Sequence, residues 1–267
     1  MQVLEASVAT NPWPLRRERA AELAERYPHA AEMLRLYHAL TVVQEAAYRI
    51  ASSQDIAAFA VEHILPGVVD VTVELGPRPL RDGVIALYAS ENMDDLIQRW
   101  LDQDALNPIE TYLARASASP LLELITPHPV PPQQGGREFE TEDSRIRCPN
   151  CRGLPQLSYF AVSGEALVSG PRYLVCSRCA TNWVFSRMTC AACGEANGTR
   201  LPIFQEQQQF PHVRVDGCQT CHKHLLTFDL RRDTRAVPVV DEIAALPLDL
   251  YARDQGLTKI AANLMGN

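Results

Sequence analysis

Eight cysteines are the residues of this 267-residue chain whose type and spacing point most directly to chemistry. They form four C-x-x-C pairs with none left over: Cys148 and Cys151, Cys176 and Cys179, Cys190 and Cys193, Cys218 and Cys221. Two residues between cysteines let one tight turn place both sulfurs on a single divalent ion. In a reducing compartment, paired thiols of this kind indicate metal knuckles. The sequence therefore predicts thiolate-ligated metal.

A duplication in the chain indicates which pairs share an ion. Twenty-four residues separate the first pair from the second, and twenty-four separate the third from the fourth. The cysteines thus repeat with an offset of 42 residues, and "CSRCATNWVF" aligns with "CQTCHKHLLT". If the first pair shared an ion with the third, and the second with the fourth, neither copy of the repeat could hold metal alone. The equal spacing in the two copies would then have no obvious cause. We expect one site made of Cys148, Cys151, Cys176 and Cys179, and a second made of Cys190, Cys193, Cys218 and Cys221.

Four sulfurs close the coordination sphere of each ion. Such a site has no open position for a substrate water, which argues against hydrolytic metal catalysis. The donor set suits both iron and zinc, so two ions per chain are predicted without a choice between these metals. Redox dithiols and disulfides are disfavoured, because the flanking sequences indicate strands and turns and a cytosolic chain keeps its thiols reduced.

The residues beside the knuckles refine this prediction. Gly194, directly after the third pair, suits the left-handed backbone that such a turn often requires, whereas Arg152, Ala180 and His222 take that place elsewhere. His222 and His224 are expected to be polar surface residues, because each site already has four cysteines. No Ser/His/Asp set, glycine-rich phosphate loop or distinctive carboxylate pair stands out. We therefore predict no catalytic residues and no enzyme.

Helical patterns dominate the chain before the cysteines. Apolar residues recur at three- and four-residue steps from Met33 to Ile50 and give one apolar face. Further helices are predicted at 16–27, 54–65, 84–104 and 108–125, the last with Asn107 as its N-cap. The stretch "VVDVTVEL", Val68 to Leu75, has a strand-like composition and predicts a strand or a loop.

The second half of the chain is organised differently. The stretch "PHPVPPQQGGREFETEDSRIR" is rich in proline, glycine and charge and predicts a linker. Short β-like runs then flank the cysteines, and "VVDEIAALPLDLYARDQG" predicts a helix kinked at Pro247 and ended near Gly256. The predicted fold class is α+β, with a helical N-terminal domain (1–126), a linker (127–147), two four-cysteine ribbons (148–187 and 188–233) and a C-terminal helix and tail (234–267).

Composition limits the partners. A hydrophobic content of 46% is ample for a core, and a net charge of −7 argues against attraction to a nucleic-acid backbone. From Cys148 to Asp233 there are nine basic and six acidic side chains, and eight thiolates with two divalent ions bring this segment to about −1. No run of about 18 apolar residues and no secretory h-region is present, so we expect a cytoplasmic chain without stable membrane insertion.

The cysteine motifs, in their order, resemble those of one known family. "CPNC", "RYLVCSRCATNW", "CAACGE" and "CQTCHKHLL", followed by "AVPVVDEIAALPLDLYARDQG", are similar to the formate dehydrogenase accessory protein family, FdhE. Residues 145–257 carry the specific part of this resemblance, and residues 16–50 agree more loosely.

The resemblance implies a non-catalytic cytoplasmic assembly protein. Such a protein would bind the catalytic subunit of a formate dehydrogenase before export and support its maturation. It also implies that the two ribbons are rubredoxin-like, with iron as a candidate metal. Two alternatives stay open: a zinc-ribbon protein that binds nucleic acid, and a rubredoxin-like electron carrier, which requires iron.

Overall fold

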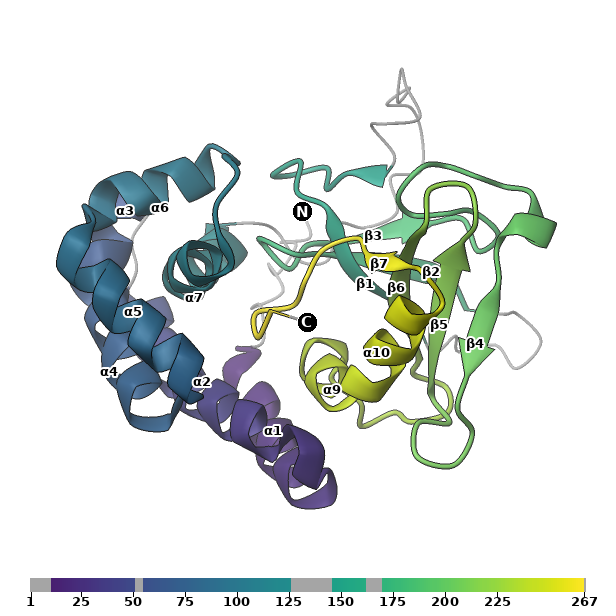
Figure 1. The fold of residues 1–267 in the computed structure, drawn as a ribbon, viewed down its shortest axis with the longest axis horizontal. Coiled ribbons are helices and arrows are strands. Elements are labelled where there is room, and N and C mark those ends of the chain that lie inside the picture. Colours follow the sequence, from purple (N-terminus) through teal and green to yellow (C-terminus); the bar gives the residue numbers. More distant parts are fainter. Residues whose placement is uncertain (1–10, 51–54, 126–145, 162–169, 267) are drawn as a thin grey trace, which may run out of the picture.

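The computed structural model describes residues 11–50, 55–125, 146–161 and 170–266, so most of the predicted linker lies outside the described residues. Among the described residues, helices form the first part of the chain, 11–125, called the helical part below, and a sheet followed by C-terminal helices forms the second (Figure 1). This arrangement confirms the predicted α+β class. The helices are α1 (Trp13–Arg26), α2 (Ala31–Ile50), α3 (Ile56–Phe59), α4 (Leu65–Leu75), α5 (Arg78–Ser90), α6 (Met93–Leu101), α7 (Pro108–Ile125), α9 (Pro238–Ala244) and α10 (Leu246–Asp254). The strands are β1 (Pro155–Phe160), β2 (Arg172–Cys176), β3 (Asn182–Phe185), β4 (Ile203–Gln205), β5 (Val213–Cys218), β6 (Lys223–Asp229) and β7 (Thr258–Lys259).

Helices α2 to α7 pack around one apolar core. The predicted apolar face of α2 supplies Leu36 and Leu40, which are fully buried against residues of α4, α6 and α7. Helix α7 begins as the sequence predicts: the Asn107 side chain accepts hydrogen bonds from the backbone N–H of Ile109 and Glu110, and the Glu110 carboxylate accepts one from the N–H of Asn107. This reciprocal capping fixes where α7 starts.

The prediction of a strand or loop at Val68 to Leu75 is wrong, because these residues belong to α4. A π-helical turn, Ala60–Ile64, connects α3 to α4, so the helical stretch continues past Pro66. Proline is tolerated there because it lies in the first turn of α4, where its missing N–H breaks no bond within that helix. Four residues of α4 at helical spacing are buried, and their contacts outweigh the strand-like composition: Leu65, Val68, Val69 and Thr72.

One further boundary differs from the prediction. The predicted helix at 84–104 is two helices, because α5 ends at Ser90 and the Asn92 side chain caps the start of α6.

The stretch Ile56–Leu75 has the length and apolar composition of a membrane span. Its buried side chains pack in the core of the helical part, so a core helix explains that composition.

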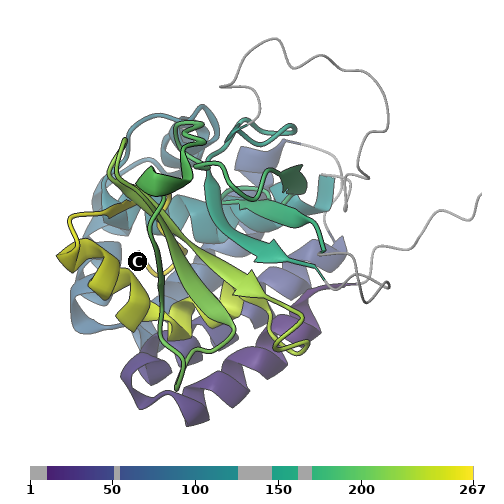
Figure 2. The same cartoon turned by 90° about the vertical axis from the view of Figure 1, so that its right-hand side faces the viewer.

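Both cysteine repeats contribute to one sheet, with the strand order β3-β2-β1-β6-β5-β4 and β7 beside β6 (Figure 2). Each repeat supplies three antiparallel strands in the same order, and β1 pairs with β6 in parallel from Leu157 opposite Leu226 to Phe160 opposite Asp229. Strands β2 and β5 therefore run in the same direction. Their last residues, Cys176 and Cys218, lie at the same edge of the sheet.

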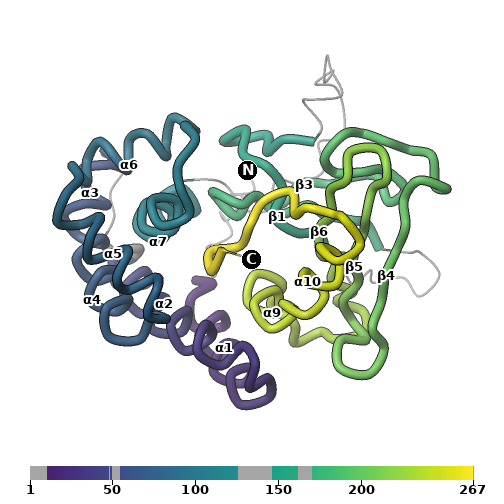
Figure 3. Tube along the Cα trace, viewed as in Figure 1, coloured from purple at the N-terminus to yellow at the C-terminus, as the bar shows by residue number. Residues whose placement is uncertain are grey.

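One face of this sheet is apolar and covered by helices. Leu157, Val175, Val215, Leu226 and Phe228 pack against α1, α9 and α10 in a single core. The two C-terminal helices are separated at Ala245, and Pro247 lies in the first turn of α10, which confirms the predicted interruption. Beyond β7 the last residues cross back towards α7, where the Arg115 guanidinium donates to the Ala262 carbonyl at 2.7 Å (Figure 3).

A buried ion pair fastens the helical part to the C-terminal helices. Arg19 of α1 donates to both carboxylate oxygens of Asp241 on α9, at 2.5 and 2.9 Å, and to Asp233 at 3.1 Å. Arg19 and Asp241 are almost fully buried. Removal of one partner of such a pair leaves an uncompensated buried charge.

We expect Arg19→Met to lower the free energy of unfolding by about 3 kcal/mol, because it leaves Asp241 buried without its cation. Arg26→Met on the same helix removes an exposed guanidinium that lies 5.2 Å from the Tyr27 ring and should cost at most about 1 kcal/mol. Urea denaturation followed by circular dichroism measures both. Equal losses in the two variants would contradict a central role for the Arg19–Asp241 pair.

Candidate metal centres

All four C-x-x-C pairs fold into the same type of hairpin. In three of them the backbone N–H of the first cysteine donates to the carbonyl five residues on: Cys148 to Gly153 (2.9 Å), Cys176 to Thr181 (2.9 Å) and Cys190 to Glu195 (2.8 Å). In the fourth, Cys218 is paired with Lys223 where β5 meets β6. The shared geometry shows that the duplication extends from the spacing of the cysteines to the backbone of each knuckle.

The residue after each second cysteine has a left-handed backbone. The φ angles are 62° at Arg152, 53° at Ala180, 78° at Gly194 and 55° at His222. This confirms the conformation expected at Gly194 and extends it to three residues that carry a Cβ. A left-handed residue other than glycine costs roughly 1–2 kcal/mol. Three knuckles adopt this unfavourable conformation because it closes the hairpin.

Backbone N–H groups and a close backbone approach surround the sulfurs. The N–H of Arg178 points at the Cys176 Sγ and that of Ala192 at the Cys190 Sγ, both at 3.4 Å. Such donors spread the charge of a thiolate. A Cβ at Gly153 would lie only 2.9 Å from the Cys176 Sγ, so glycine is needed where the first knuckle passes the second.

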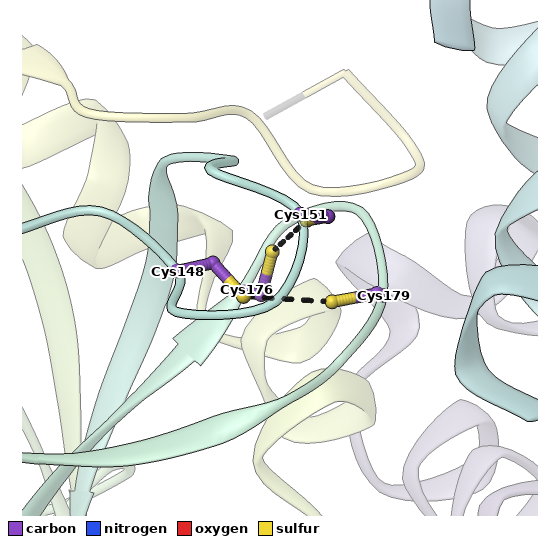
Figure 4. Close-up of side chains that lie close together, drawn as sticks. All are labelled: Cys148, Cys151, Cys176 and Cys179. Carbon is purple, nitrogen blue, oxygen red and sulfur yellow. Dashed lines mark hydrogen bonds between the residues drawn. The ribbon is translucent and has the colours of Figure 1, made fainter. Parts of the chain in front are cut away.

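The structure brings the eight cysteines together in the two groups that the repeat predicts, and either group could hold a metal ion. Figure 4 shows the first group, in which Sγ–Sγ distances are 3.6 Å for Cys148 and Cys179 and 3.4 Å for Cys151 and Cys176. In the second group, the pairs Cys190–Cys221 and Cys193–Cys218 are each 3.8 Å apart. A tetrahedral ion with metal–sulfur bonds of about 2.3 Å separates its sulfurs by about 3.8 Å. The sulfurs therefore fit a four-coordinate ion, and all eight are free thiols rather than disulfides.

Protonation of the thiols explains what a cation would contribute. Hydrogen bonds from Cys151, Cys176 and Cys179 hold the pKa of Cys148 well below its ordinary range, and the bond to Cys148 raises the pKa of Cys151. In the second group, burial raises the pKa of Cys221 to about 11. Cys148 thus ionises readily, whereas Cys151 and Cys221 retain their protons until a divalent ion replaces them. Metal binding would release these protons, so affinity should fall as the pH falls.

The two groups differ in their surroundings. The first group is mostly buried, and its knuckles contact the helical part: the Arg178 guanidinium donates to the carbonyls of Trp100 and Leu101 at 2.8 and 2.9 Å, and Gln103 donates to the Cys151 carbonyl at 3.1 Å. Trp183 packs beside its sulfurs, which agrees with a hydrophobic cover. In the second group Cys193 is exposed and Cys221 is half-buried. Solvent and partners thus reach the second group more easily.

The expectation that His224 is a surface residue is wrong, whereas His222 is exposed as expected. His224 lies on the face of β6 that also carries Leu226 and Phe228, and its Nε2 is 2.9 Å from Asp249 of α10. Lys259 donates to Asp249 at 2.6 Å and lies 2.7 Å from Glu242 of α9. This buried polar network fastens the C-terminal segment to both helices. No alternation in β6 marks His224 as buried, because the strand is buried on both faces from His224 to Phe228.

The difference in exposure predicts that the second group releases its metal first. With a chelator in excess, we expect two phases of release, because exposed Cys193 gives water and chelator a route that the first group lacks. Time-resolved alkylation followed by mass spectrometry identifies the order. Cys190, Cys193, Cys218 and Cys221 should become labelled before Cys148, Cys151, Cys176 and Cys179, and simultaneous labelling would contradict the prediction.

Gly194 and Ala180 occupy the same left-handed position in two knuckles, so opposite substitutions at these residues can be compared. Gly194→Ala places a Cβ at a φ of 78° and should cost about 1 kcal/mol, which corresponds to roughly fivefold weaker metal binding at the second group. Ala180→Gly relieves the same strain and should leave binding at the first group equal or tighter. Competition with a chromogenic chelator measures both affinities. Unchanged binding in Gly194→Ala would show that the backbone conformation does not limit ligation.

Comparisons with known proteins agree with the order of the cysteine motifs. Residues 147–187 match the central domain of FdhE, and residues 188–265 match its C-terminal domain. An FdhE homologue from Aquifex aeolicus is 34% identical over 119 residues, 45% of this chain and 41% of that protein. One from Pseudomonas putida is 31% identical over 131 residues, 48% of this chain and 41% of that protein. The match thus spans about two fifths of the length of these relatives.

Longer matches extend the similarity to the helical part. An FdhE homologue from Citrobacter koseri is 24% identical over 278 residues, 95% of this chain and 87% of that protein. The crystal structure of the FdhE protein from Pseudomonas aeruginosa superposes with a TM-score of 0.66 at 21% identity, over 95% of this chain and 94% of that chain, so the fold is shared. These findings confirm the predicted resemblance: residues 147–265 match the central and C-terminal domains of FdhE, and the fold is shared with the FdhE protein from Pseudomonas aeruginosa.

Proposed function

We propose that this chain is an accessory protein for the maturation of a formate dehydrogenase, and that it binds the catalytic subunit of that enzyme in the cytoplasm before export. The observation that carries the proposal is the match of residues 147–265 to the two FdhE domains, with both four-cysteine groups intact. The chain acts by binding its client, and it is not an enzyme.

Each four-cysteine group binds one ion, iron or zinc. The sulfur spacing fits a tetrahedral ion whose coordination the protein completes, so the ion supplies folding free energy rather than a site for substrate. Ribbons as short as these bury too little apolar surface to be stable alone. Structural zinc contributes about 10–16 kcal/mol in small peptides of this kind, which is enough to fold each knuckle pair. Client binding therefore depends on metal-loaded ribbons.

The charge of the protein favours a protein partner over nucleic acid. The net charge is −7, and the metal-loaded segment from Cys148 to Asp233 stays near −1. Neither value gives the basic surface that phosphate contacts require. Binding of a polypeptide client does not require a basic surface.

An electron carrier is a second candidate, and the exposure of Cys193 favours it. A sulfur that solvent reaches also lies within range of a redox partner, provided that the ion is iron. Protein purified without oxygen and then mildly oxidised distinguishes the metals, because ferric iron bound to four thiolates is coloured and zinc is not. A colourless protein with two zinc ions per chain rejects this candidate.

Loss of either group should abolish the proposed activity. Cys176→Ser and Cys218→Ser each remove one ligand and should eliminate formate dehydrogenase activity in a host that depends on this protein. Gln219→Ser, directly beside Cys218 but exposed, is the matched control and should leave activity unchanged. Normal activity in both cysteine variants would reject the requirement for intact ribbons.

Co-purification tests client binding directly. The tagged chain is expressed anaerobically beside the catalytic subunit, and the purified material is analysed for metal content and for that subunit. We expect two metal ions per chain and a bound catalytic subunit. Two ions without the subunit would reject the proposed client while leaving the metal sites in place.

A further inference from the structure

A cleft separates the helical part from the first four-cysteine group. Its volume is about 720 Å³, within the range of ligand-binding cavities. Helix α7 and the start of α5 line one side, and the knuckle residues Gly153, Leu154, Ser177 and Arg178 line the other. The C-terminal segment 261–266 completes the wall. The cleft is thus built from both parts of the protein and touches the shell of one metal centre.

Apolar side chains that are only half-buried face this cleft. They come from α2, α5, the loop before α7, α7 itself and the first knuckle: Met33, Leu80, Leu106, Ile109 and Leu154. Isolated half-buried apolar residues need no explanation, but their convergence on one cleft marks an interaction site. Burial of these side chains against an apolar partner would be favourable.

The arginines of the cleft argue against an anionic small molecule as the occupant. Arg115 donates to the Ala262 carbonyl, Arg147 to the Arg152 carbonyl, and Arg178 to the carbonyls of Trp100 and Leu101. Arg115 also donates to the Gln156 side chain, so each of these guanidinium groups already has an acceptor within the protein. Recognition in this cleft is therefore directed at apolar side chains.

The chain's own C-terminal segment, which forms one wall of the cleft, shows that a peptide packs against this apolar surface. This segment is not helical, and its Ala262 carbonyl accepts the hydrogen bond from Arg115 at 2.7 Å. Leu264 and Met265 pack against both the core of the helical part and the core of the sheet. A second peptide laid beside this segment would meet the same apolar surface.

We propose that this cleft binds a short apolar, non-helical segment of the client polypeptide, alongside residues 261–266. The client is the catalytic subunit, so the inference rests on the proposed function and places its binding surface. Because the first knuckles form one wall, loss of metal from Cys148, Cys151, Cys176 and Cys179 would remove that wall. The metal ion would thus support client binding by holding the wall of the cleft in place, and the ion itself would not contact the client.

Charged substitutions in the cleft test this proposal. Short overlapping peptides that cover the catalytic subunit are labelled with a fluorophore and titrated with the metal-loaded full chain by fluorescence anisotropy. We expect apolar segments to bind, and Leu106→Asp and Pro79→Asp each to weaken binding at least about tenfold. Pro79 is exposed on the rim of the cleft, so Pro79→Asp should fold. It therefore tests the cleft even if Leu106→Asp fails to fold. Ile85→Asp changes an exposed apolar residue outside the cleft and should leave binding within about twofold.

Co-purification of the intact catalytic subunit separates the two proposals. If the unchanged protein retains the subunit and the Pro79→Asp variant loses it, the cleft is the docking site. Equal retention by both, or equal peptide binding by all variants, overturns the cleft while the proposed function stands. Failure of the unchanged protein to retain the subunit overturns the proposed function. A small molecule that native mass spectrometry finds on the unchanged protein and not on Leu106→Asp would replace the peptide as occupant.

Discussion

The parallel pairing of β1 with β6 is the contact on which the rest of this structure depends. It joins two short ribbons, each of three antiparallel strands, into one sheet. Neither ribbon has enough apolar surface for a core of its own. Joined, they present a continuous apolar face that α1, α9 and α10 cover. The same pairing aligns β2 with β5, so the cysteines that end these strands lie at one edge.

Equivalent knuckles in the two repeats have come to occupy different environments. The first four-cysteine group lies against the loop after α6, and Arg178 and Gln103 hold it there through backbone carbonyls. The second exposes Cys193 and leaves Cys221 half-buried. The ligands and hairpins are the same, so the difference comes from what packs around each group. One group therefore braces the two parts of the protein, and the other is accessible from outside.

Buried charges decide how the C-terminal helices return onto the sheet. Arg19 pairs with Asp241, and Lys259 lies between Glu242 and Asp249, so each helix has a charged partner on another element. A charge buried without its partner is strongly unfavourable, and shifted packings of α9 or α10 would leave several unpaired. These pairs select one arrangement from the many that apolar contacts alone would allow.

Features of this protein that depend on neighbouring residues can be predicted from its sequence. Ligand type, the two-residue spacing and the 42-residue repeat were enough to predict the knuckles and the two groups of four, because a C-x-x-C turn is a local structure. The apolar period of α2 and the Asn107 cap of α7 were predictable for the same reason. Three features follow instead from long-range contacts: Val68 to Leu75 is helical, His224 is buried beside Asp249, and the two ribbons share one sheet. Each of these depends on which distant residues come to lie alongside, and burial against them outweighs the local preference of the chain.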